Sequence, residues 1–493
     1  GPIRNDSVSG SDVDVLSGAE YRLDLAQPVG RRVVALSVGG RSVTDRDSFT
    51  LALNNYRAGG GGGYAMLARA PVVYDRGEDI RELLAAEIRR RGTIRAEDYF
   101  QRNWEIVGLP AASAAAGATS VAGATPAAPR DSIILRVFET NDFHGALLPR
   151  TQSWSNGREV GGAAVIAGMM TRLTREAGAP TLRLDVGDMM QGTPISNLSF
   201  GRATVEAFNA MGYAAAAIGN HEFDWTPDTM AARIQGARFP WLSANLRTTT
   251  GARPAWARPW AMVRAGSLKV ALIGYTTILL ASVSRPDYVA NLRVDSGAAI
   301  VDSLVALARG DSAADVVILL AHEGAFCDER QGCRGEVVDL ARALTQKPDL
   351  IVSGHTHSLV TTVVNGIPII QARSSGTALG IADIVALPGG GRTVRLRVET
   401  VYADRERPDT AVARLVDAYR LATDSLTTRV IATLADALTR QADQYPLGNL
   451  IADAYRAAAR ADIAVVNNGG IRSDLEAGAV SWGQLFQVLP FQN

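Results

Sequence analysis

The chain has 493 residues, more than one ordinary hydrophobic core organises, which predicts at least two domains. Its 50 basic and 50 acidic residues give zero net charge, so the charge balance argues against nucleic-acid or anionic-membrane binding. No apolar stretch is long enough to cross a bilayer, and we expect no integral membrane segment.

Residues 1–109 form the first predicted segment, which mixes strands and one helix. Short apolar runs predict strands at 32–38 and 49–53, whereas acids early and arginines late predict a helix at 79–91. Five glycines, 59–63, lie between Tyr56 and Tyr64. They form either a loop without a ligand or a backbone that approaches a ligand closely.

Residues 110–131 consist mainly of small residues and proline, which predicts a flexible linker. From 132 to 405, apolar strands alternate with helices, which indicates a layered α/β domain around a buried sheet. The expected strands are 133–140, 181–186, 214–218, 270–275, 316–320 and 350–352, the expected helices are 163–177, 203–211, 228–235, 298–308 and 335–344, and 367–372 with 394–401 are expected to form an extra β layer.

Residues 406–427 predict an amphipathic helix that connects two domains. The last segment, 428–493, carries a predicted helix at 449–460 and a strand at 463–466. Cys327 and Cys333 are the chain's two cysteines. They predict a small disulfide formed in an oxidising compartment, with two free surface thiols as the alternative.

All five histidines follow apolar, strand-like runs, at positions where an open α/β sheet gathers its ligands. Other possible metal ligands accompany them at the same strand ends. The strand ends carry Asn141-Asp142-Phe143-His144, Asp185-Val186-Gly187-Asp188, Asn220-His221, His322-Glu323-Gly324 and His355-Thr356-His357. Imidazole, carboxylate and amide donors favour Zn²⁺, Mn²⁺, Co²⁺ or Fe²⁺ over Ca²⁺. They are too many for one ion, and two carboxylate-bridged ions would use them all.

In this order, the motifs Asp-x-His, Gly-Asp, Gly-Asn-His-Glu, His-x-Gly and Gly-His-x-His resemble the calcineurin-like metallophosphoesterases. Within them, the segments 141–145, 220–224 and 468–472 are similar to the periplasmic 5′-nucleotidase/UDP-sugar hydrolase family. The resemblance covers nearly all of the chain except the linker. It implies an α/β (α+β) fold: a four-layer β-sandwich flanked by helices, plus a smaller α/β nucleotide-binding domain.

The resemblance also implies two divalent ions: zinc, manganese, cobalt, iron or magnesium. Asp142, His144 and His357 would hold one ion, whereas Asn220, His322 and His355 would hold the other. Asp188 would bridge them. His221 would assist a metal-activated hydroxide at the phosphoryl group, and Asp224 would orient its ring or, alternatively, cap a helix. Glu222 has no assigned role.

In the family, the nucleotide-binding domain follows the metal domain, but here its second part resembles 1–109 and its first part resembles 428–493. This order predicts a circular permutant. The family's base-stacking rings correspond to Tyr56 and Phe491, although Phe491 alternatively packs in the core. Other substrate contacts correspond to the phosphate-gripping Arg472, the polar Asn467 and Asn493, and Arg440, whose spacing fits less well. Gly62 stands where the family usually has a ribose-binding Asp, which places nucleoside specificity in question.

Together these features predict two-metal hydrolysis of nucleoside monophosphates to nucleoside and phosphate. Hydrolysis of cyclic nucleotides, nucleotide sugars or a sulfur-group carrier, or nucleotide binding without turnover, are the alternatives. We expect a monomer whose partner is a small-molecule nucleotide and whose two domains move relative to one another. No signal peptide opens the chain, and we expect a periplasmic or secreted protein whose leader was removed.

Overall fold

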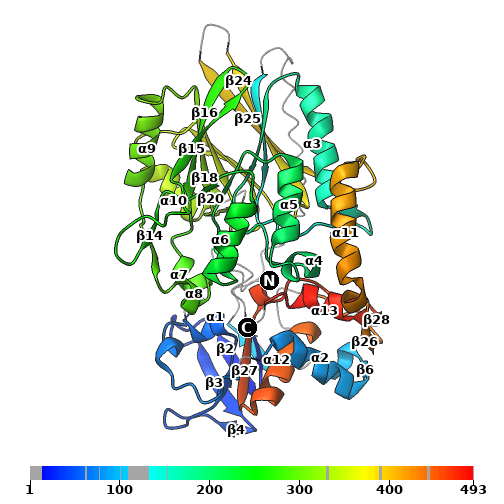
Figure 1. Cartoon of the computed structure of the whole chain (residues 1–493). Helices are drawn as coiled ribbons and strands as arrows, with labels where there is room; N and C mark the ends of the chain where they lie inside the picture. Colours follow the sequence, from blue (N-terminus) through cyan, green and yellow to red (C-terminus); the bar gives the residue numbers. More distant parts are fainter. Residues whose placement is uncertain are drawn as a thin grey trace. The chain divides into compact units, whose positions relative to one another are not determined.

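The computed structural model describes residues 14–60, 64–76, 78–99, 102–108, 133–152, 154–328, 332–387, 391–440 and 445–491 (Figure 1). The chain divides into two compact units. The terminal unit combines residues 1–126 with residues 424–493, and the central unit comprises residues 127–423.

The central unit contains two six-stranded sheets. The first sheet has the order β13 (Trp241–Leu242), β12 (Ala215–Ala217), β11 (Thr181–Asp185), β8 (Ile133–Thr140), β24 (Ala378–Ala386) and β25 (Arg392–Thr400). The second has the order β15 (Trp260–Ala265), β16 (Leu268–Tyr275), β18 (Val316–Ala321), β21 (Leu350–Ser353), β23 (Ile367–Ala372) and β22 (Leu359–Val364). The expected extra β layer was wrong, because β23 and β25 pair directly into these sheets.

Three hydrophobic cores stack the central unit into four layers. One core fills the space between the sheets, with Val137 from the first and Leu272 from the second. A second core packs α3 (Ala163–Ala177) and α5 (Arg202–Met211) on the outer face of the first sheet. The third packs α9 (Ala299–Arg309) and α10 (Glu336–Ala343) on the outer face of the other sheet, as Figure 1 shows. The metallophosphoesterase-type sandwich expected from the sequence is therefore confirmed.

Local sequence explains why these elements end where they do. Helix α3 buries one apolar face, and Gly178 ends it in the left-handed conformation at φ 62°. The remaining helices and strands of the central unit are β9 (Arg150–Thr151), β10 (Glu159–Val160), α4 (Pro194–Asn197), α6 (Pro227–Gly236), β14 (Leu246–Thr248), α7 (Leu280–Val283), α8 (Pro286–Val289), β17 (Leu292–Val294), β19 (Phe326–Asp328) and β20 (Gly332–Arg334). Helix α11 (Thr410–Thr427) buries Val412 and Val416 and ends in the terminal unit.

The terminal unit is built from both ends of the chain. Its three sheets have the orders β1 (Asp14–Ser17), β27 (Ile463–Asn467), β5 (Leu51–Ala52); β28 (Gly478–Ser481), β26 (Val430–Leu434), β6 (Thr93–Ile94); and β4 (Arg41–Ser42), β3 (Val33–Val38), β2 (Ala19–Asp24), β7 (Trp104–Val107). Its helices are α1 (Asn55–Ala58), α2 (Ile80–Arg91), α12 (Pro446–Ala459) and α13 (Trp482–Val488). Because β1 pairs with β27 and β6 with β26, residues from the two ends share one hydrophobic core.

The described helices contain no segment with both the length and the apolar character needed to cross a bilayer.

Candidate active site

The seven metal ligands predicted from the sequence all follow strands of the two central sheets. Asp142 and His144 follow β8, Asp188 follows β11, Asn220 follows β12, His322 follows β18, and His355 and His357 follow β21. All five strands run parallel to a neighbouring strand. Their carboxyl ends therefore gather side chains that are far apart in the sequence.

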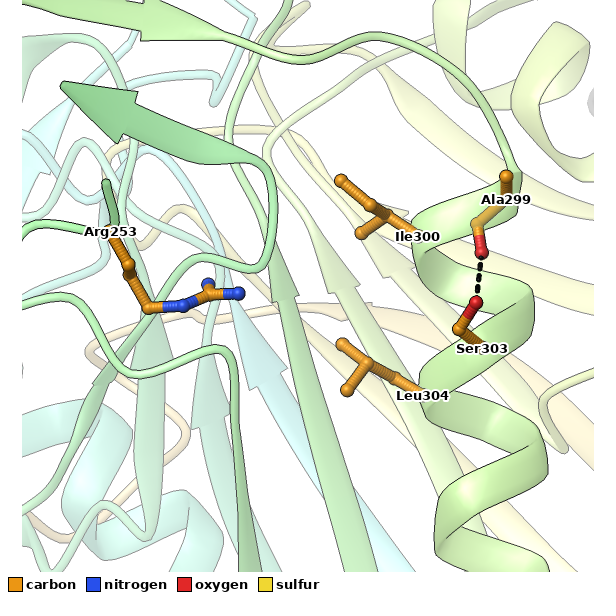
Figure 2. Close-up of a pocket in the computed structure, with 5 residues that line it drawn as sticks. All are labelled: Arg253, Ala299, Ile300, Ser303 and Leu304. Carbon is orange, nitrogen blue, oxygen red and sulfur yellow. Dashed lines mark hydrogen bonds between the residues drawn. The ribbon is translucent and has the colours of Figure 1, made fainter. Parts of the chain in front are cut away.

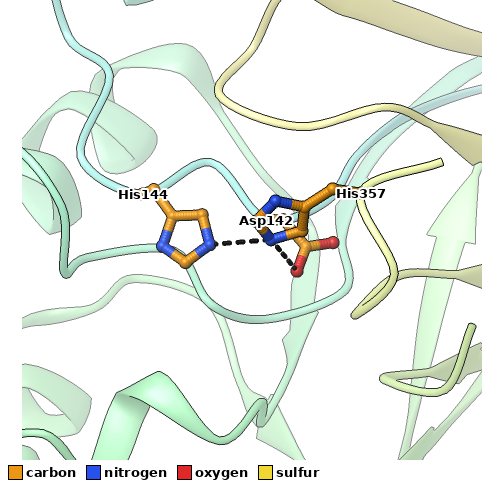
Figure 3. A group of neighbouring side chains, drawn as sticks. All are labelled: Asp142, His144 and His357. Carbon is orange, nitrogen blue, oxygen red and sulfur yellow. Dashed lines mark hydrogen bonds and ion pairs between the residues drawn. The ribbon is translucent and has the colours of Figure 1, made fainter. Parts of the chain in front are cut away.

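Asp142, His144 and His357 form the first group, shown in Figure 3. The Nε2 atoms of the two histidines are 3.1 Å apart, and His357 Nε2 lies 3.3 Å from Asp142 Oδ1. His144 donates from Nδ1 to the Gln191 carbonyl, which leaves the lone pair on its Nε2 directed at the group.

Asp188, His322 and His355 form the second group. His322 Nε2 lies 3.2 Å from Asp188 Oδ2 and 3.2 Å from the amide oxygen of Asn220. The Nδ1 atom of His322 is held by the Val186 carbonyl at 2.8 Å. Asn220 thus lies beside the second group.

Three observations fit these residues to divalent cations. The ligand atoms within each group lie within 4.8 Å of one another. Asp142 Oδ1 is buried without a hydrogen-bond partner among the described residues, which leaves one oxygen for a cation. Five of the seven ligands adopt left-handed φ angles between 48° and 71°: Asp142, His144, Asp188, His355 and His357. Strain of this kind costs about 1–3 kcal/mol per residue and clusters at functional sites.

Burial and neighbouring charges set the protonation of the metal-free groups. Burial alone would raise the pKa of Asp142, but His357 holds that pKa below its ordinary value. Burial disfavours the imidazolium of His322, yet the Asp188 carboxylate raises the pKa of His322 to about 10. Burial and the nearby His322 lower the pKa of His355 to about 4. In the metal-free protein, carboxylates and imidazoles thus share protons, and a bound cation would displace these protons.

His221 and Asp224 form a hydrogen-bonded pair next to the first group. His221 Nδ1 is 2.8 Å from Asp224 Oδ2, and its ring centroid lies 5.3 Å from that of His144. The backbone N–H of His221 donates to Asp188 Oδ1 at 2.7 Å, which fixes the start of this turn. Asp224 does not cap the following helix, because Thr226 is the N-cap residue of α6.

Glu222 is the functional residue that the sequence left without a role. Its carboxylate is fully buried and accepts the backbone N–H groups of Asp188, Met189 and Gly219 at 2.8–2.9 Å. Burial and Asp188 raise the pKa of Glu222 to about 7, although the backbone N–H groups oppose this shift. Glu222 therefore holds the Asp188 turn against the His221 turn.

Position 219 requires glycine because a side chain does not fit there. A Cβ atom there would lie 2.3 Å from Asp188 Oδ1. This close approach to Asp188 accounts for the glycine at this position.

In the terminal unit, the structure brings together three of the predicted substrate contacts. The Arg472 guanidinium lies 5.2 Å from the centre of the Phe491 ring, and the side chain of Arg440 donates to the Arg472 carbonyl at 3.2 Å. Phe491 is half-buried instead of packed in the core.

Tyr56 and Asn467 belong to neighbouring segments of the same unit. Asn54 donates to Asn467 Oδ1 at 2.7 Å, and the Tyr56 ring lies 5.1 Å from the guanidinium carbon of Arg57. Arg57 is fully buried and pairs with Asp14, a support that the sequence did not indicate. Gly62 and Asn493 lie outside the described residues.

A cavity of about 320 Å³ lies elsewhere in the central unit, between Arg253 and one face of α9. Figure 2 shows Ile300 and Leu304 facing Arg253 across it. It contains none of the predicted ligands, and Arg253 is held by the carbonyls of Ser243 and Ala244.

Two family models match the chain. The calcineurin-like phosphoesterase model matches residues 135–359, and the model of the 5′-nucleotidase C-terminal domain matches residues 4–69 together with 427–493. A 5′-nucleotidase of Vibrio vulnificus is 30% identical over 406 residues, covering 73% of this chain and 72% of that protein. The chain belongs to the 5′-nucleotidase family of calcineurin-like phosphoesterases.

Two further relatives are much longer than this chain. The chain spans 32% of the endonuclease YhcR and 38% of the trifunctional nucleotide phosphoesterase YfkN, both from Bacillus subtilis. The YfkN alignment is 25% identical and covers 99% of this chain. The same order of segments therefore occurs within a longer protein, and circular permutation, which is not needed to explain the order, stays a prediction.

Among solved structures, the 5′-nucleotidase precursor from Thermus thermophilus is similar with a TM-score of 0.62 and 25% sequence identity. The match covers 72% of this chain and 74% of that one.

Proposed function

We propose that this chain hydrolyses phosphate monoesters of nucleotides, converting a nucleoside monophosphate and water to a nucleoside and phosphate. The observation that carries the proposal is the pair of Asp/His groups beside the His221–Asp224 pair. Membership of the 5′-nucleotidase family supports it, because a relative named 5′-nucleotidase is 30% identical over 73% of this chain.

The two groups would each hold one divalent cation, with Asn220 completing the second and Asp188 placed between them. When bound, the two cations would activate water and neutralise phosphoryl oxygens. Nitrogen and oxygen donors support zinc, manganese, cobalt or iron, and magnesium is also to be tested.

His221 would act on the leaving oxygen. Because Asp224 accepts from Nδ1, the opposite ring nitrogen, Nε2, is the one available to the substrate. As the bond between phosphorus and the nucleoside oxygen breaks, a proton on Nε2 would pass to that oxygen. Glu222 would act only through Asp188, by keeping its turn in place.

The terminal unit would recognise the nucleotide. Arg472 offers a guanidinium fork for phosphate, and Phe491 and Tyr56 offer rings on which a base can stack. Asn467, Asn493 and Arg440 remain candidates for the polar contacts. The domain boundaries at 109, 131, 405 and 427 and a monomeric state also stay proposals.

Release of phosphate from AMP by protein loaded with Mn²⁺ or Zn²⁺ tests the proposal. Removing a general acid typically costs 10²–10⁴ in rate, so His221→Ala should lower kcat by about that factor while the metal content stays unchanged. Asp224→Asn should lower kcat less, because it misorients the ring without removing it. Asp228→Asn, at an exposed acid four residues further on, is the matched control and should be neutral.

Full activity of His221→Ala on every nucleotide would show that the assigned role is wrong. The substrate panel should include cyclic nucleotides and nucleotide sugars, and binding without phosphate release would favour a non-catalytic protein.

We also propose that the protein works in the periplasm or outside the cell. The bond between Cys327 and Cys333 supports an oxidising compartment.

A further inference from the structure

The short segment 488–491 follows the last turn of α13 in the terminal unit and carries Phe491. The Val488 carbonyl accepts from the backbone N–H of Arg472 at 2.8 Å, and the Arg472 guanidinium lies 5.2 Å from the centre of the Phe491 ring. This segment therefore lies at the proposed nucleotide site. Where the Phe491 ring can meet a base depends on how the segment is held.

Arg81, from the other end of the chain, holds this segment. It lies on α2, is 1% exposed, and donates from Nη1 to the Leu489 carbonyl at 3.3 Å. Its guanidinium carbon lies 3.9 Å from the centre of the Phe486 ring and 5.4 Å from that of the Trp482 ring, both on α13. Asp79, the N-cap residue of α2, pairs with its Nη2. One guanidinium thus ties the start of α2 to α13 and to the segment that follows it.

Little backbone freedom separates the anchored carbonyl from the Phe491 ring. Pro490 is the single residue between Leu489 and Phe491, it is buried, and its own ring fixes φ. The Leu489 carbonyl therefore sets the position from which the Phe491 side chain starts. Phe491 itself is half-buried, so part of its ring surface remains exposed.

Packing alone does not account for an arginine at position 81. Its Nε atom is buried without a hydrogen-bond partner among the described residues, and its charge is buried against the partly exposed Asp79. An apolar side chain of similar length would fill the space beside Phe486 and Trp482 without a buried charge or an unpaired donor. What such a side chain could not supply is the bond to the Leu489 carbonyl.

We propose that Arg81 is a positioning residue for nucleotide recognition, which holds the Leu489 carbonyl so that the Phe491 ring is placed to stack on the base. The inference rests on the proposed function and adds a residue to it. Arg81 acts through Phe491 without touching the nucleotide. It therefore controls how tightly the nucleotide binds rather than how fast the bound nucleotide reacts, because the reacting groups belong to the central unit.

Steady-state hydrolysis of AMP by the metal-loaded full chain tests this role. Arg81→Met keeps the length and the packing but removes the donors. It should raise KM about tenfold, as expected for a lost charge-assisted hydrogen bond, while kcat changes less than about twofold. Arg81→Lys keeps the charge and can still donate, so its KM should rise less.

Asn449→Ala is the matched control for the loss of a buried hydrogen bond. Asn449 is also a buried donor that joins the two parts of the terminal unit, through the Tyr99 carbonyl. The control variant should melt at a lower temperature, as Arg81→Met does, but its KM should stay within about twofold of the unmodified protein.

A double-mutant cycle separates positioning from general damage to the unit. Because Arg81 acts through the Phe491 ring, Arg81→Met should add less than about twofold to KM in the Phe491→Ala background. The affinity for adenosine, measured by calorimetry on the same four proteins, should follow the same pattern, because nucleoside binding requires no hydrolysis. Should Arg81→Met fail to fold, Arg81→Lys takes its place in both cycles.

An unchanged KM in Arg81→Met, an equal rise in Asn449→Ala, or losses that add when the changes at 81 and 491 are combined would overturn the inference. If the unmodified protein hydrolysed no nucleotide, the proposed function would fail, and the adenosine cycle would still decide the role of Arg81. Non-additive losses of adenosine affinity would support that role, whereas additive losses or no adenosine binding by the unmodified protein would overturn it.

Discussion

Glu139 places a carboxyl group in the core between the two central sheets. It lies on β8 opposite Leu184 and Gly380, on the same face as Val137, and is fully buried. Neither of its oxygens has a hydrogen-bond partner among the described residues. Burial, with smaller contributions from Asp185 and Asp142, raises the pKa of Glu139 well above its ordinary value. The carboxyl group of Glu139 therefore keeps its proton to higher pH than that of an exposed glutamate.

The raised pKa of Glu139 predicts a specific pH dependence of stability. The unfolded carboxyl ionises near pH ~4.3, whereas the folded one keeps its proton to higher pH. The folded state thus binds more protons above that pH, and the stabilisation is lost as pH rises. Glu139→Gln, which does not titrate, should flatten this decline. Thermal unfolding of the metal-free protein at pH 5, 6, 7 and 8 checks this. As pH rises, the melting temperature of Glu139→Gln should fall less than that of the unmodified protein.

The exposed Glu159→Gln serves as the control and should follow the unmodified protein. If Glu139→Gln gave a parallel curve at every pH, the carboxyl would not be the titrating group.

For single residues, the sequence predicted candidate ligands that lie at strand ends. It missed residues whose role depends on tertiary contacts. Strand ends gather ligands, so the positions of His322 and Asp142 made them candidate ligands, whereas their assignment to particular ions came from the family resemblance. Glu222 binds the Asp188 backbone 34 residues away, and no local pattern reveals that bond.

The hairpin of β19 and β20 supports the loop that carries two of the proposed metal ligands, His355 and His357. Cys327 and Cys333 face each other across this hairpin and form the predicted disulfide. Just before the hairpin, the Ala325 carbonyl accepts from Thr356 Oγ1 at 3.0 Å. Thr356 lies between His355 and His357, so the hairpin and the ligand loop are joined by this bond.

Removing the disulfide should loosen the hairpin and the loop that carries His355 and His357. A ring of this size contributes about 2 kcal/mol in the chain-entropy description. The double variant Cys327→Ser/Cys333→Ser should therefore melt at a lower temperature and lose metal faster to a chelator. Thr356→Val, which keeps the shape but not the hydroxyl, should speed metal loss with the disulfide intact.

The exposed Thr250→Val, at a surface turn, controls for the loss of a hydroxyl. If the cysteine double variant and Thr356→Val both retained metal as well as the unmodified protein does, the ligand loop would keep its structure without the hairpin.

The sequence predicted the boundaries of helices and strands best where the local apolar pattern is long. The predicted limits of α3 and β8 match the structure, because long apolar patterns define them. Short strands such as β1 and β28 were missed, since four residues carry too little pattern. The assignment of 367–372 and 394–401 to a separate layer failed because strand pairing is a property of the sheet rather than of the strand.

Across the whole molecule, the terminal unit is made of two parts of the chain. The entire central unit lies between them in the sequence. Val15 on β1 packs against α12, where a Cβ atom on Gly448 would lie 2.7 Å from its side chain. Asn449 on α12 donates to the Tyr99 carbonyl at 2.6 Å, and the buried Arg81 donates to the Leu489 carbonyl. Neither part has a complete core without the other.

Two separate polypeptides, residues 1–126 and 127–493, should therefore associate when co-expressed. The association should survive 1 M salt, because the shared core is apolar and salt screens only charged contacts. Affinity purification through a tag on the short fragment, followed by size-exclusion chromatography, should recover both fragments in equal amounts. Val15→Asp, which buries a charge in the shared core, should abolish recovery, whereas Val29→Asp at an exposed position should not. Recovery of the short fragment alone, with residues 127–493 still folded and able to bind metal, would show that the two ends of this chain do not fold together.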